Sequence, residues 1–548
     1  MPPLRLDYVS PLPPVRSGIA DYTADLLPFL AERPEIAELR VMHLPGQPVS
    51  DDFASRWHPV PAAETGDDGR LPLYQMGNNQ HHEGVLELAM ERPGVLTLHD
   101  LVLHHLLVER TLSRGVFEPY AEALERDHGW VGAAVAGTRR WAGYTDGGVF
   151  ALPAHRTLLR RQRGVLVHSA WAAGVVAEED PEIAVRAIPM AVPLPAAAGP
   201  PGGEAARAAR RAFGLPEEAH VLGSFGFQTP IKRTAAAVRA LARPELAGVH
   251  LLVVGEVSPQ VDLDAAAAEA GVADRVHVTG FVDYDRFEQG LAACDLALNL
   301  RYPTAGETSA SLLRLLAAGR GAVVSDYAQF RDLPPAAVAR VPLGDPEEAE
   351  LAAVCGALLS DPARLAAMGA AARAHVAAEH DPERAAAAVA AACAELAERE
   401  PPGDRPATAP PASSAAARHL GGVLAVEGLD RPWPAGERRR LTVRVTNSGD
   451  SRWLATRRGP GGVAFVVALE TEEGDGGTVD LAAGHPWLAL PRDLAPGEEA
   501  VLPLDLRRPP GPARLALTPL VLDGWSGERV TTAGERGLQA PCWAGELP

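Results

Sequence analysis

One stretch decides the fold of this chain: Gly223-Ser-Phe-Gly-Phe-Gln-Thr-Pro-Ile-Lys-Arg233. An apolar strand ends here in a loop that contains glycine and proline, and a helical pattern follows the loop. The loop holds Lys232, the single lysine among 51 lysine and arginine residues. In α/β proteins such a loop binds a phosphate with backbone amides, an ammonium group and a helix N-terminus. The alternative is a lysine that lies by chance on a solvated surface.

The alternation of strands and helices continues after this stretch. Strands that alternate with helices indicate a parallel sheet with both faces covered. Residues 204–400 are therefore predicted to form one Rossmann-like, doubly wound α/β domain, which an Ala-rich helical segment closes. The predicted strands are 220–226, 249–255, 275–280, 296–302 and 322–325, and the predicted helices are 233–242, 262–270, 283–293, 308–318 and 345–400.

The amino-terminal part of the chain shows the same alternation. It predicts a second Rossmann-like domain over residues 1–195, so that two doubly wound domains lie in tandem. A segment rich in proline, alanine and glycine, 193–203, joins them and has the composition of a hinge. The predicted strands are 4–10, 39–44, 71–77, 95–99 and 165–168, and the predicted helices are 18–32, 84–91, 120–126 and 154–162.

The pattern changes after residue 400. Residues 401–418 are rich in proline and alanine and are predicted to be a linker. In residues 419–548 the hydrophobic period becomes two, as in 439–446 and 500–506. Several short alternating strands in such a length predict an all-β sandwich.

Composition limits the classes of function. A formal net charge of −19 over 548 residues argues against nucleic acid as a partner. The four cysteines are scattered and have neither metal-ligand spacing nor the pattern of a disulfide framework. A cytoplasmic location is therefore expected. The sequence shows no signal-peptide pattern and no apolar run that could span a bilayer, so any membrane contact is expected to be peripheral.

A second polar segment follows another predicted strand: Asn299-Leu-Arg-Tyr-Pro-Thr-Ala-Gly-Glu-Thr-Ser-Ala-Ser311. Glu307 lies at the start of the next helix, with the hydroxyls of Thr308, Ser309 and Ser311 in position to cap it. In the simpler interpretation Glu307 only caps the helix. Together with Lys232, however, this segment predicts two anion-binding loops at the carboxyl ends of neighbouring strands, where doubly wound domains bind nucleotides.

With these motifs, residues 4–396 resemble the retaining glycosyltransferases of family 4, which have the GT-B fold. The family segment Gly-Arg-x-x-x-x-Lys-Gly is matched by Gly226 and Lys232, while Phe227 replaces its arginine and Arg233 its last glycine. The resemblance implies that Lys232 holds the diphosphate of a nucleotide-sugar donor. Arg233 would supply the missing guanidinium from a different direction.

The family also has two glutamates eight positions apart, the first near the sugar and the second on the ribose of the nucleotide. Glu307 matches the first, whereas Arg314 stands near the second. An arginine cannot accept the hydrogen bonds of ribose hydroxyls as a carboxylate does. The resemblance assigns Gly306, Thr308, Ser309 and Ser311 to the donor site.

The amino-terminal domain supplies further candidates. Gly18 follows the first strand, where the family has a small-residue loop beside the donor phosphates; a plain strand-to-helix turn is the alternative. His99 ends a strand, as does a family histidine at the reaction centre, although a lone histidine there is usually structural. Asp100 beside it, with Asn78 and Asn79, would bind the acceptor. The two asparagines are equally well explained as turn residues.

The implied function is the transfer of a sugar from a nucleotide-diphosphate sugar to an acceptor hydroxyl, a hexosyltransferase-like reaction with retention. It would serve polysaccharide, glycan or glycolipid synthesis of the bacterial type. No cofactor and no metal are expected, apart from the nucleotide sugar as co-substrate. Two alternatives stay open. One is a scaffold that binds a nucleotide sugar without turning it over, and the other is a GT-B epimerase that needs no acceptor.

Two surface features bear on partners. Six arginines make the amino-terminal domain locally basic, which favours either a solvated helix face or peripheral contact with an anionic membrane surface. They are Arg139, Arg140, Arg156, Arg160, Arg161 and Arg163. The carboxyl-terminal sandwich resembles the immunoglobulin-like modules attached to bacterial cell-surface polysaccharide enzymes.

Overall fold

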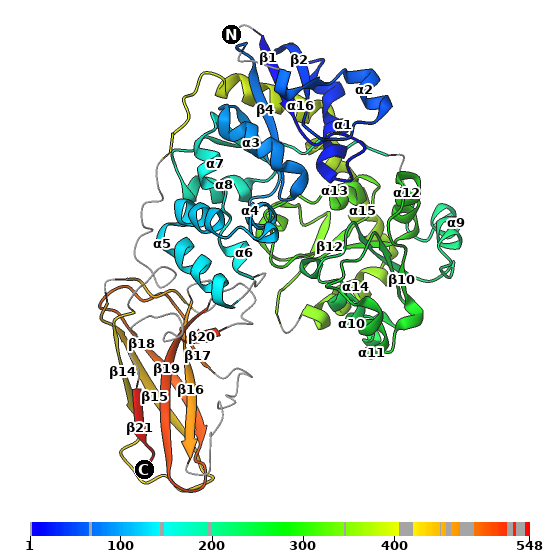
Figure 1. The fold of residues 1–548 in the computed structure, drawn as a ribbon. Helices are drawn as coiled ribbons and strands as arrows, with labels where there is room; N and C mark the ends of the chain where they lie inside the picture. Colours follow the sequence, from blue (N-terminus) through cyan, green and yellow to red (C-terminus); the bar gives the residue numbers. More distant parts are fainter. Residues whose placement is uncertain are drawn as a thin grey trace. The chain divides into compact units, whose positions relative to one another are not determined.

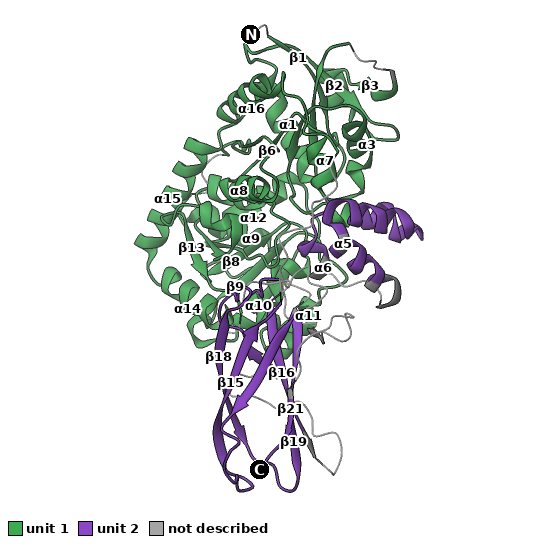
Figure 2. Ribbon diagram, turned by 90° about the vertical axis from the view of Figure 1, so that its left-hand side faces the viewer, with its two compact units in different colours: residues 1–106, 155–404 green, residues 107–154, 405–548 purple. Residues whose placement is uncertain are grey.

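The structure is a computed structural model in which two compact units are distinguished (Figure 2). The first comprises residues 1–106 and 155–404, and the second comprises residues 107–154 and 405–548. The described residues are 3–64, 68–142, 147–195, 199–344, 347–404, 420–449, 451–455, 462–471, 487–522, 530–532 and 543–548.

The first unit contains two lobes, each built on a parallel sheet. The sheet of the amino-terminal lobe has the strand order β3-β2-β1-β4-β5-β6-β7. The order reverses between β1 and β4, and this reversal creates a crevice at the carboxyl ends of the strands. The strands are β1 (Leu4–Val9), β2 (Ile36–His43), β3 (Val60–Pro61), β4 (Leu71–Met76), β5 (Val95–Leu98), β6 (Gly164–Val167) and β7 (Val185–Ala187).

Both faces of this sheet are buried, as expected for a doubly wound fold. Tyr8 packs into the hydrophobic core on one face and its neighbour Val9 into the core on the other face. The helices of this lobe are α1 (Gly18–Leu30), α2 (Asp51–Trp57), α3 (Glu83–Glu91), α4 (His104–Arg110), α7 (Arg156–Arg160) and α8 (Ala170–Glu179), with 3₁₀ turns η1 (Ala62–Glu64) and η2 (Gln80–His82).

The second lobe repeats this plan, with the strand order β10-β9-β8-β11-β12-β13 and all pairs parallel. Its order reverses between β8 and β11. The strands are β8 (Val221–Phe225), β9 (His250–Val254), β10 (Val276–Val278), β11 (Leu296–Asn299), β12 (Ala322–Ser325) and β13 (Val338–Val341). The helices are α9 (Glu204–Ala212), α10 (Thr234–Ala240), α11 (Leu263–Glu269), α12 (Tyr284–Ala293), α13 (Ala310–Ala317), α14 (Glu347–Leu359) and α15 (Pro362–Glu379), with 3₁₀ turns η4 (Pro230–Lys232), η5 (Pro244–Leu246), η6 (Ala273–Arg275) and η7 (Ala328–Asp332).

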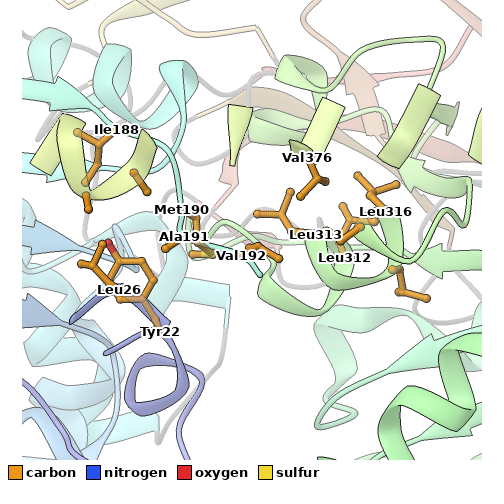
Figure 3. Close-up of a cluster of buried hydrophobic side chains, with 14 of the residues drawn as sticks. Tyr22, Leu26, Ile188, Met190, Ala191, Val192, Leu312, Leu313, Leu316 and Val376 are labelled. Atoms are coloured by element: carbon orange, nitrogen blue, oxygen red, sulfur yellow. The ribbon is translucent and has the colours of Figure 1, made fainter. Parts of the chain in front are cut away.

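The chain then returns to the first lobe. Helix α16 (Pro382–Leu396) packs against α1, beside the sheet of the first lobe (Figure 1). A methyl group on Gly164 of β6 would come within 2.6 Å of the Leu396 side chain, so helix and strand approach closely. The two lobes therefore share a hydrophobic cluster that includes Tyr22 on α1, Ile188 to Val192 in the connecting segment, and Leu312 on α13 (Figure 3).

The second unit contains helices and an all-β part. Its helical segment includes η3 (Leu112–Arg114), α5 (Glu118–Ala142) and α6 (Gly147–Ala151). Two antiparallel sheets follow, with the strand orders β14-β15-β18 and β17-β16-β19-β20, where β21 also pairs with β19. Both sheets contribute to one core around the buried Trp453. The strands are β14 (Gly422–Glu427), β15 (Arg438–Asn447), β16 (Val463–Thr471), β17 (Trp487–Ala489), β18 (Glu499–Arg507), β19 (Ala513–Leu522), β20 (Val530–Thr532) and β21 (Trp543–Glu546).

The predicted fold class, two tandem Rossmann-like α/β domains followed by an all-β part, is confirmed. Two differences concern domain membership: residues 107–154 fall in the second compact unit, and α16, inside the predicted domain 204–400, packs against α1 of the first lobe. The other differences are local. The strand predicted at 39–44 begins earlier, at Ile36, and the short strands β3, β7 and β13 were not predicted. The helix predicted at 120–126 is part of the longer α5, and the helix predicted at 154–162 is shortened to α7. Most of the linker, 405–418, lies outside the described residues.

Candidate functional site

The candidate site lies where the crevices of the two sheets meet. The first lobe contributes the loops after β1, β4 and β5, and the second contributes the loops after β8 and β11. The loops after β5 and β11 are in direct contact, because the amide of Val102 donates to the carbonyl of Ala305 over 3.1 Å. Gly306 has a φ of +80°, and a methyl group on it would come within 2.6 Å of the Leu101 side chain. This contact therefore requires glycine at position 306.

Lys232 ends the turn η4, in the loop that follows β8. Its ammonium donates to the carbonyl of Phe225, and a methyl group on Gly226 would lie 2.9 Å from its Nζ. The amide of Tyr302 donates to the carbonyl of Ile231 over 2.8 Å and so fixes the segment after β11 beside this turn. Burial, with the nearby Arg301 charge, holds the pKa of Lys232 well below its usual range. An anion in this space would favour the charged ammonium.

Glu307 is held in place by three donors from its own loop. Arg301 Nε donates to its Oε1 over 2.7 Å, while Thr304 Oγ1 and the Ala305 amide donate to its Oε2 over 3.1 Å. The carbonyl of Glu307 accepts from Gln329 Nε2 over 2.7 Å. The carboxylate is thus oriented from both sides and does not bond to the helix start as a simple cap would.

The start of α13 is capped by a hydroxyl that the sequence predicted. Ser309 is the N-cap residue and accepts from the Leu312 amide over 3.3 Å. Its hydroxyl donates to Asn299 Oδ1 at the end of β11, and Ser311 Oγ lies 3.2 Å away. Asn299 Nδ2 is buried and has no partner among the described residues. Buried donors of this kind are normally satisfied, so this one points to a bound polar group or water.

His99 lies at the end of β5, as predicted, and polar side chains surround it. Its Nε2 is 3.0 Å from Gln75 Oε1, and its Nδ1 is 3.2 Å from His168 Nε2. The ring of Tyr22 packs edge-on against it, with 4.9 Å between the ring centroids. Burial lowers the pKa of His99 well below its usual range, and the pKa of His168 to about 4. Both imidazoles are therefore neutral at pH 7.

The predicted acceptor residues have different surroundings. Asp100 Oδ2 accepts from the Asn78 amide over 3.0 Å. Burial, followed by the charge of Glu307, raises the pKa of Asp100 to about 7. Asn78 organises the start of α4, because its side chain is 2.9 Å from His105 Nδ1 and accepts from the Leu106 amide. Asn79 caps the turn η2 by accepting from the His81 amide, which is the turn role considered above.

Three further candidates occupy specific positions. Gly18 opens α1 behind the N-cap Ser17, and a methyl group there would meet nothing within 4 Å. Arg233 pairs with the buried Glu347, with 2.7 Å between Nε and Oε1, so its predicted donor-binding role would require that pair to open. Thr308 is partly exposed and faces a cavity described below.

Arg314 joins the two lobes. Its Nη2 donates to Asp25 of α1 over 2.8 Å, and its Nη1 donates to the hydroxyl of Tyr284 over 3.2 Å. Burial is the largest influence on Asp25 and raises its pKa to about 6, even though Arg314 opposes the shift. Arg314, which stands near the family's second glutamate position, therefore serves as an interlobe contact in this structure.

A cavity of about 380 Å³ lies between the lobes, beside the start of α13. Apolar side chains such as Ile188 and Leu313 line it together with polar ones. Its polar lining includes His168, Thr308, Ser309, Gln329, Asp332 and His380. Gln329 Oε1 is buried and has no partner among the described residues. The cavity thus offers apolar walls and an acceptor for a hydroxyl group.

Sequence reasoning did not assign a role to three residues that the structure brings into the site: Tyr22, Gln75 and Arg301. They come from one helix and two strand ends, so only the folded chain shows that they converge. Of the three, only Arg301 has a sequence signal, because it lies two residues after β11 inside the polar segment singled out above. Among the described residues, no group of three or more histidine, cysteine or acidic side chains could hold a metal ion.

The chain also shows similarity to known proteins. Residues 233–391 match the model of a family described as glycosyl transferase-like. A segment of 150 residues is 36% identical to the 2-deoxystreptamine glucosyltransferase of Streptomyces kanamyceticus. This match covers 26% of the chain and 38% of the relative, so the chain spans well under half the length of that enzyme.

The fold itself is shared more widely. The sucrose-phosphate synthase of Thermosynechococcus elongatus superimposes with a TM-score of 0.50 at 18% identity, covering 72% of this chain and 99% of that one. The Anabaena protein HepE, solved in complex with UDP and glucose, gives a TM-score of 0.48 at 16% identity and covers 72% of this chain and 100% of that one. The likeness to the synthase shows that the two lobes have the GT-B fold.

Proposed function

We propose that this protein is a glycosyltransferase that moves a sugar from a nucleotide-diphosphate sugar to an acceptor hydroxyl. The observation that carries the proposal is the contact between three loops: the loop that begins at His99 bonds to the loop of Glu307 through Val102 and Ala305, and the segment after β11 bonds to the turn of Lys232 through Tyr302 and Ile231. The glycosyl transferase-like family match over 233–391 supports it, because this range contains Glu307 and the start of α13. The similarity to a glucosyltransferase supports it too.

The chemistry requires stabilisation of a leaving group. The bond between the sugar carbon and the diphosphate oxygen breaks, and its electron pair stays on that oxygen. The acceptor oxygen bonds to the same carbon, and its proton passes to the departing diphosphate. A bound anion would keep Lys232 protonated. Its ammonium and the amides at the start of α13 would then lie where this negative charge develops.

The sugar would be oriented by the first and second lobes together. Glu307 would accept hydrogen bonds from sugar hydroxyls, since two of its own donors could be exchanged for them. The neutral His99 would hydrogen-bond the sugar or the acceptor without adding positive charge. We propose that the enzyme belongs to family 4, retains the configuration of the sugar and needs no metal. These proposals rest on the resemblance of the Lys232 and Glu307 segments.

The acceptor is proposed to be a hydroxyl-bearing glycan or glycolipid of bacterial-type polysaccharide synthesis. The cavity beside α13 is large enough for one sugar ring, and Gln329 Oε1 would accept one of its hydroxyls. The immunoglobulin-like sandwich would be an accessory module. We propose a cytoplasmic location, in keeping with the scattered cysteines. No single helix in the described ranges is long and apolar enough to span a membrane, and α14 meets the requirement only when joined to 362–396 across a bend of 99°.

Peripheral membrane contact would rest on the arginines of the amino-terminal domain, and several of them are bound within the protein. Arg160 pairs with Asp180 over 2.7 Å, Arg161 pairs with Asp404, and Arg163 donates to the carbonyl of Ala397. The side chain of Arg140 lies outside the described residues. Paired arginines attract an anionic lipid surface less than free ones do.

A nucleotide-sugar-binding scaffold is the second candidate function. It is favoured by Phe227 at the family's arginine position and by Arg314, whose guanidinium is bound to Asp25. Both departures remove expected contacts to the donor. In this case the chain would bind a nucleotide sugar and transfer nothing.

The first test is a ligand screen followed by a transfer assay. We expect the melting temperature of the full chain to rise by several degrees with one of UDP, GDP or ADP, and with its sugar conjugates, but much less with the matching monophosphate. Transfer to added sugars and glycolipid extracts would then be followed by mass spectrometry. Stabilisation without any transfer or hydrolysis would favour the scaffold. If no nucleoside diphosphate raised the melting temperature, both the transferase and the scaffold would be contradicted.

Affinity for the nucleoside diphosphate is expected to fall as the pH rises from about 6.5 to 8.5, by roughly threefold to tenfold per pH unit at the steepest point. Asp100, with a pKa of about 7, becomes negative over this range beside Glu307 and Arg301. Burial also lowers the pKa of Lys232, so its ammonium loses its proton at a lower pH than usual. Both changes make the site less positive. Bound diphosphate favours the protonated forms, so binding takes up protons.

Calorimetry in two buffers of different ionisation enthalpy would measure this proton uptake. The Asp100→Asn variant is the matched control, because it keeps the shape and removes the titration. It should flatten the pH dependence while leaving the response of Lys232. An affinity that is constant or rises with pH would contradict the assignment.

A further inference from the structure

The proposed reaction places two or more negative charges on one small site. The family pattern meets them with an arginine and a lysine from one loop, but here the arginine position is Phe227. This side chain is 53% exposed and carries no charge. Lys232 is half-buried and donates to the carbonyl of Phe225. A second cation is therefore expected elsewhere in the site.

Two nearby arginines are already engaged. Arg233 makes a two-pronged pair with Glu347, whose side chain is 2% exposed. Breaking this pair would leave a buried carboxylate without a partner, which is strongly destabilising. Arg314 is bound to Asp25 of the other lobe and to Tyr284. Neither guanidinium is free to meet a ligand without the loss of these contacts.

Arg301 is placed differently. It lies two residues after the end of β11, is 6% exposed, and its backbone amide donates to Ser325 Oγ over 3.0 Å. Its Nε donates to Glu307 and its Nη1 makes a long contact of 3.4 Å with the carbonyl of Leu300. Its Nη2 has no hydrogen-bond partner among the described residues. One edge of the guanidinium thus orients Glu307, and the other is available.

Arg301 also shares its surroundings with Lys232. The hydrogen bond between the Tyr302 amide and the Ile231 carbonyl joins the residues next to each of them. The charge of Arg301 lowers the pKa of Lys232, as expected for two cations that face a common space. A buried arginine with a free edge beside a half-buried lysine is a site for an anion with two charged groups.

We propose, on the basis of the proposed function, that Arg301 is a catalytic residue that binds the donor diphosphate together with Lys232 and replaces the arginine missing at position 227. The same guanidinium links the two parts of the reaction. Its Nε holds the carboxylate that orients the sugar, and its Nη2 meets the charge of the leaving diphosphate. The cation is contributed by the loop after β11 and not by the loop after β8.

The test measures the affinities of the Arg301→Gln variant for UDP, GDP and ADP and for the matching monophosphates. We expect the diphosphate affinity to fall by about tenfold to a hundredfold, and the monophosphate affinity by less than about threefold. Arg301→Lys should recover part of the loss. Arg239→Gln is the matched control, because it removes an exposed arginine–glutamate pair of the same lobe, with Glu348. It should change neither affinity.

The decisive variant is the double substitution Phe227→Arg with Arg301→Gln. An arginine restored at the exposed position 227 should return the diphosphate affinity to within about threefold of the original value. If Arg301 only orients Glu307, the ratio of diphosphate to monophosphate affinity stays unchanged in Arg301→Gln and the double variant rescues nothing; either result overturns the proposal. If the unmodified chain binds no diphosphate, the proposed function itself fails. Binding that depends on Lys232 but not on Arg301 overturns the inference alone.

Discussion

Replacement of Lys232 by alanine is expected to reduce sugar transfer by about a thousandfold, because the ammonium meets the charge that develops on the leaving diphosphate. The free energy of unfolding should change little, since the ammonium is enclosed and its removal relieves an unfavourable burial of charge. Initial rates with the donor found in the ligand screen would measure the effect, with thermal melting as the check on folding.

Lys232→Arg is the informative companion variant. The guanidinium is larger and planar, and the space beside Gly226 is narrow. A methyl group placed on Gly226 would lie only 2.9 Å from Lys232 Nζ. We therefore expect little recovery of activity. Full activity in Lys232→Ala, with normal folding, would end the role of this residue in phosphate binding.

Glu307→Gln is expected to lower turnover by about a hundredfold or more, while the affinity for the nucleoside diphosphate stays the same or rises. The amide keeps the size of the side chain but loses a negative charge close to the diphosphate site. It also weakens the charge-assisted bond from Arg301. Steady-state rates and calorimetric binding of the diphosphate, measured on the same preparation, would separate the two effects.

The control for this variant is Glu348→Gln, which removes the partly exposed partner of Arg239 in the same lobe. It should leave both rate and affinity unchanged. An equal loss of turnover and diphosphate affinity in Glu307→Gln would make Glu307 a residue of donor binding and not of sugar orientation.

The sequence was most informative where strand, loop and helix follow one another. The loops of Lys232 and Glu307 were placed at the ends of β8 and β11 because apolar strands and helix signals flank them. Strands of two to four residues, such as β3, β7 and β13, were missed because too few residues show a period. The doubly wound plan did not depend on them.

The surroundings of the predicted residues were less accessible. His99 was assigned to the site by its strand end, but its contacts to Gln75 and His168 come from strands that pair only in the folded sheet. The ion pair of Arg233 with Glu347 spans more than a hundred residues, so no local pattern reveals it. Sequence alone therefore identified the candidate side chains, whereas their hydrogen-bond and ion-pair partners could be identified only from the three-dimensional structure.

The return of α16 to the first lobe means that the backbone crosses between the lobes twice. The two crossings are bonded to each other, since the amide of Val192 donates to the carbonyl of His380 over 2.9 Å and His380 Nδ1 lies 3.2 Å from the carbonyl of Met190. Two crossings that are bonded to each other restrain a twist of one lobe against the other. We therefore expect the lobes to move mainly by rotation about the axis that passes through both crossings. The return of α16 also sets a minimum length for a truncated chain, because a truncation before Leu396 would expose apolar residues of α1 that α16 covers.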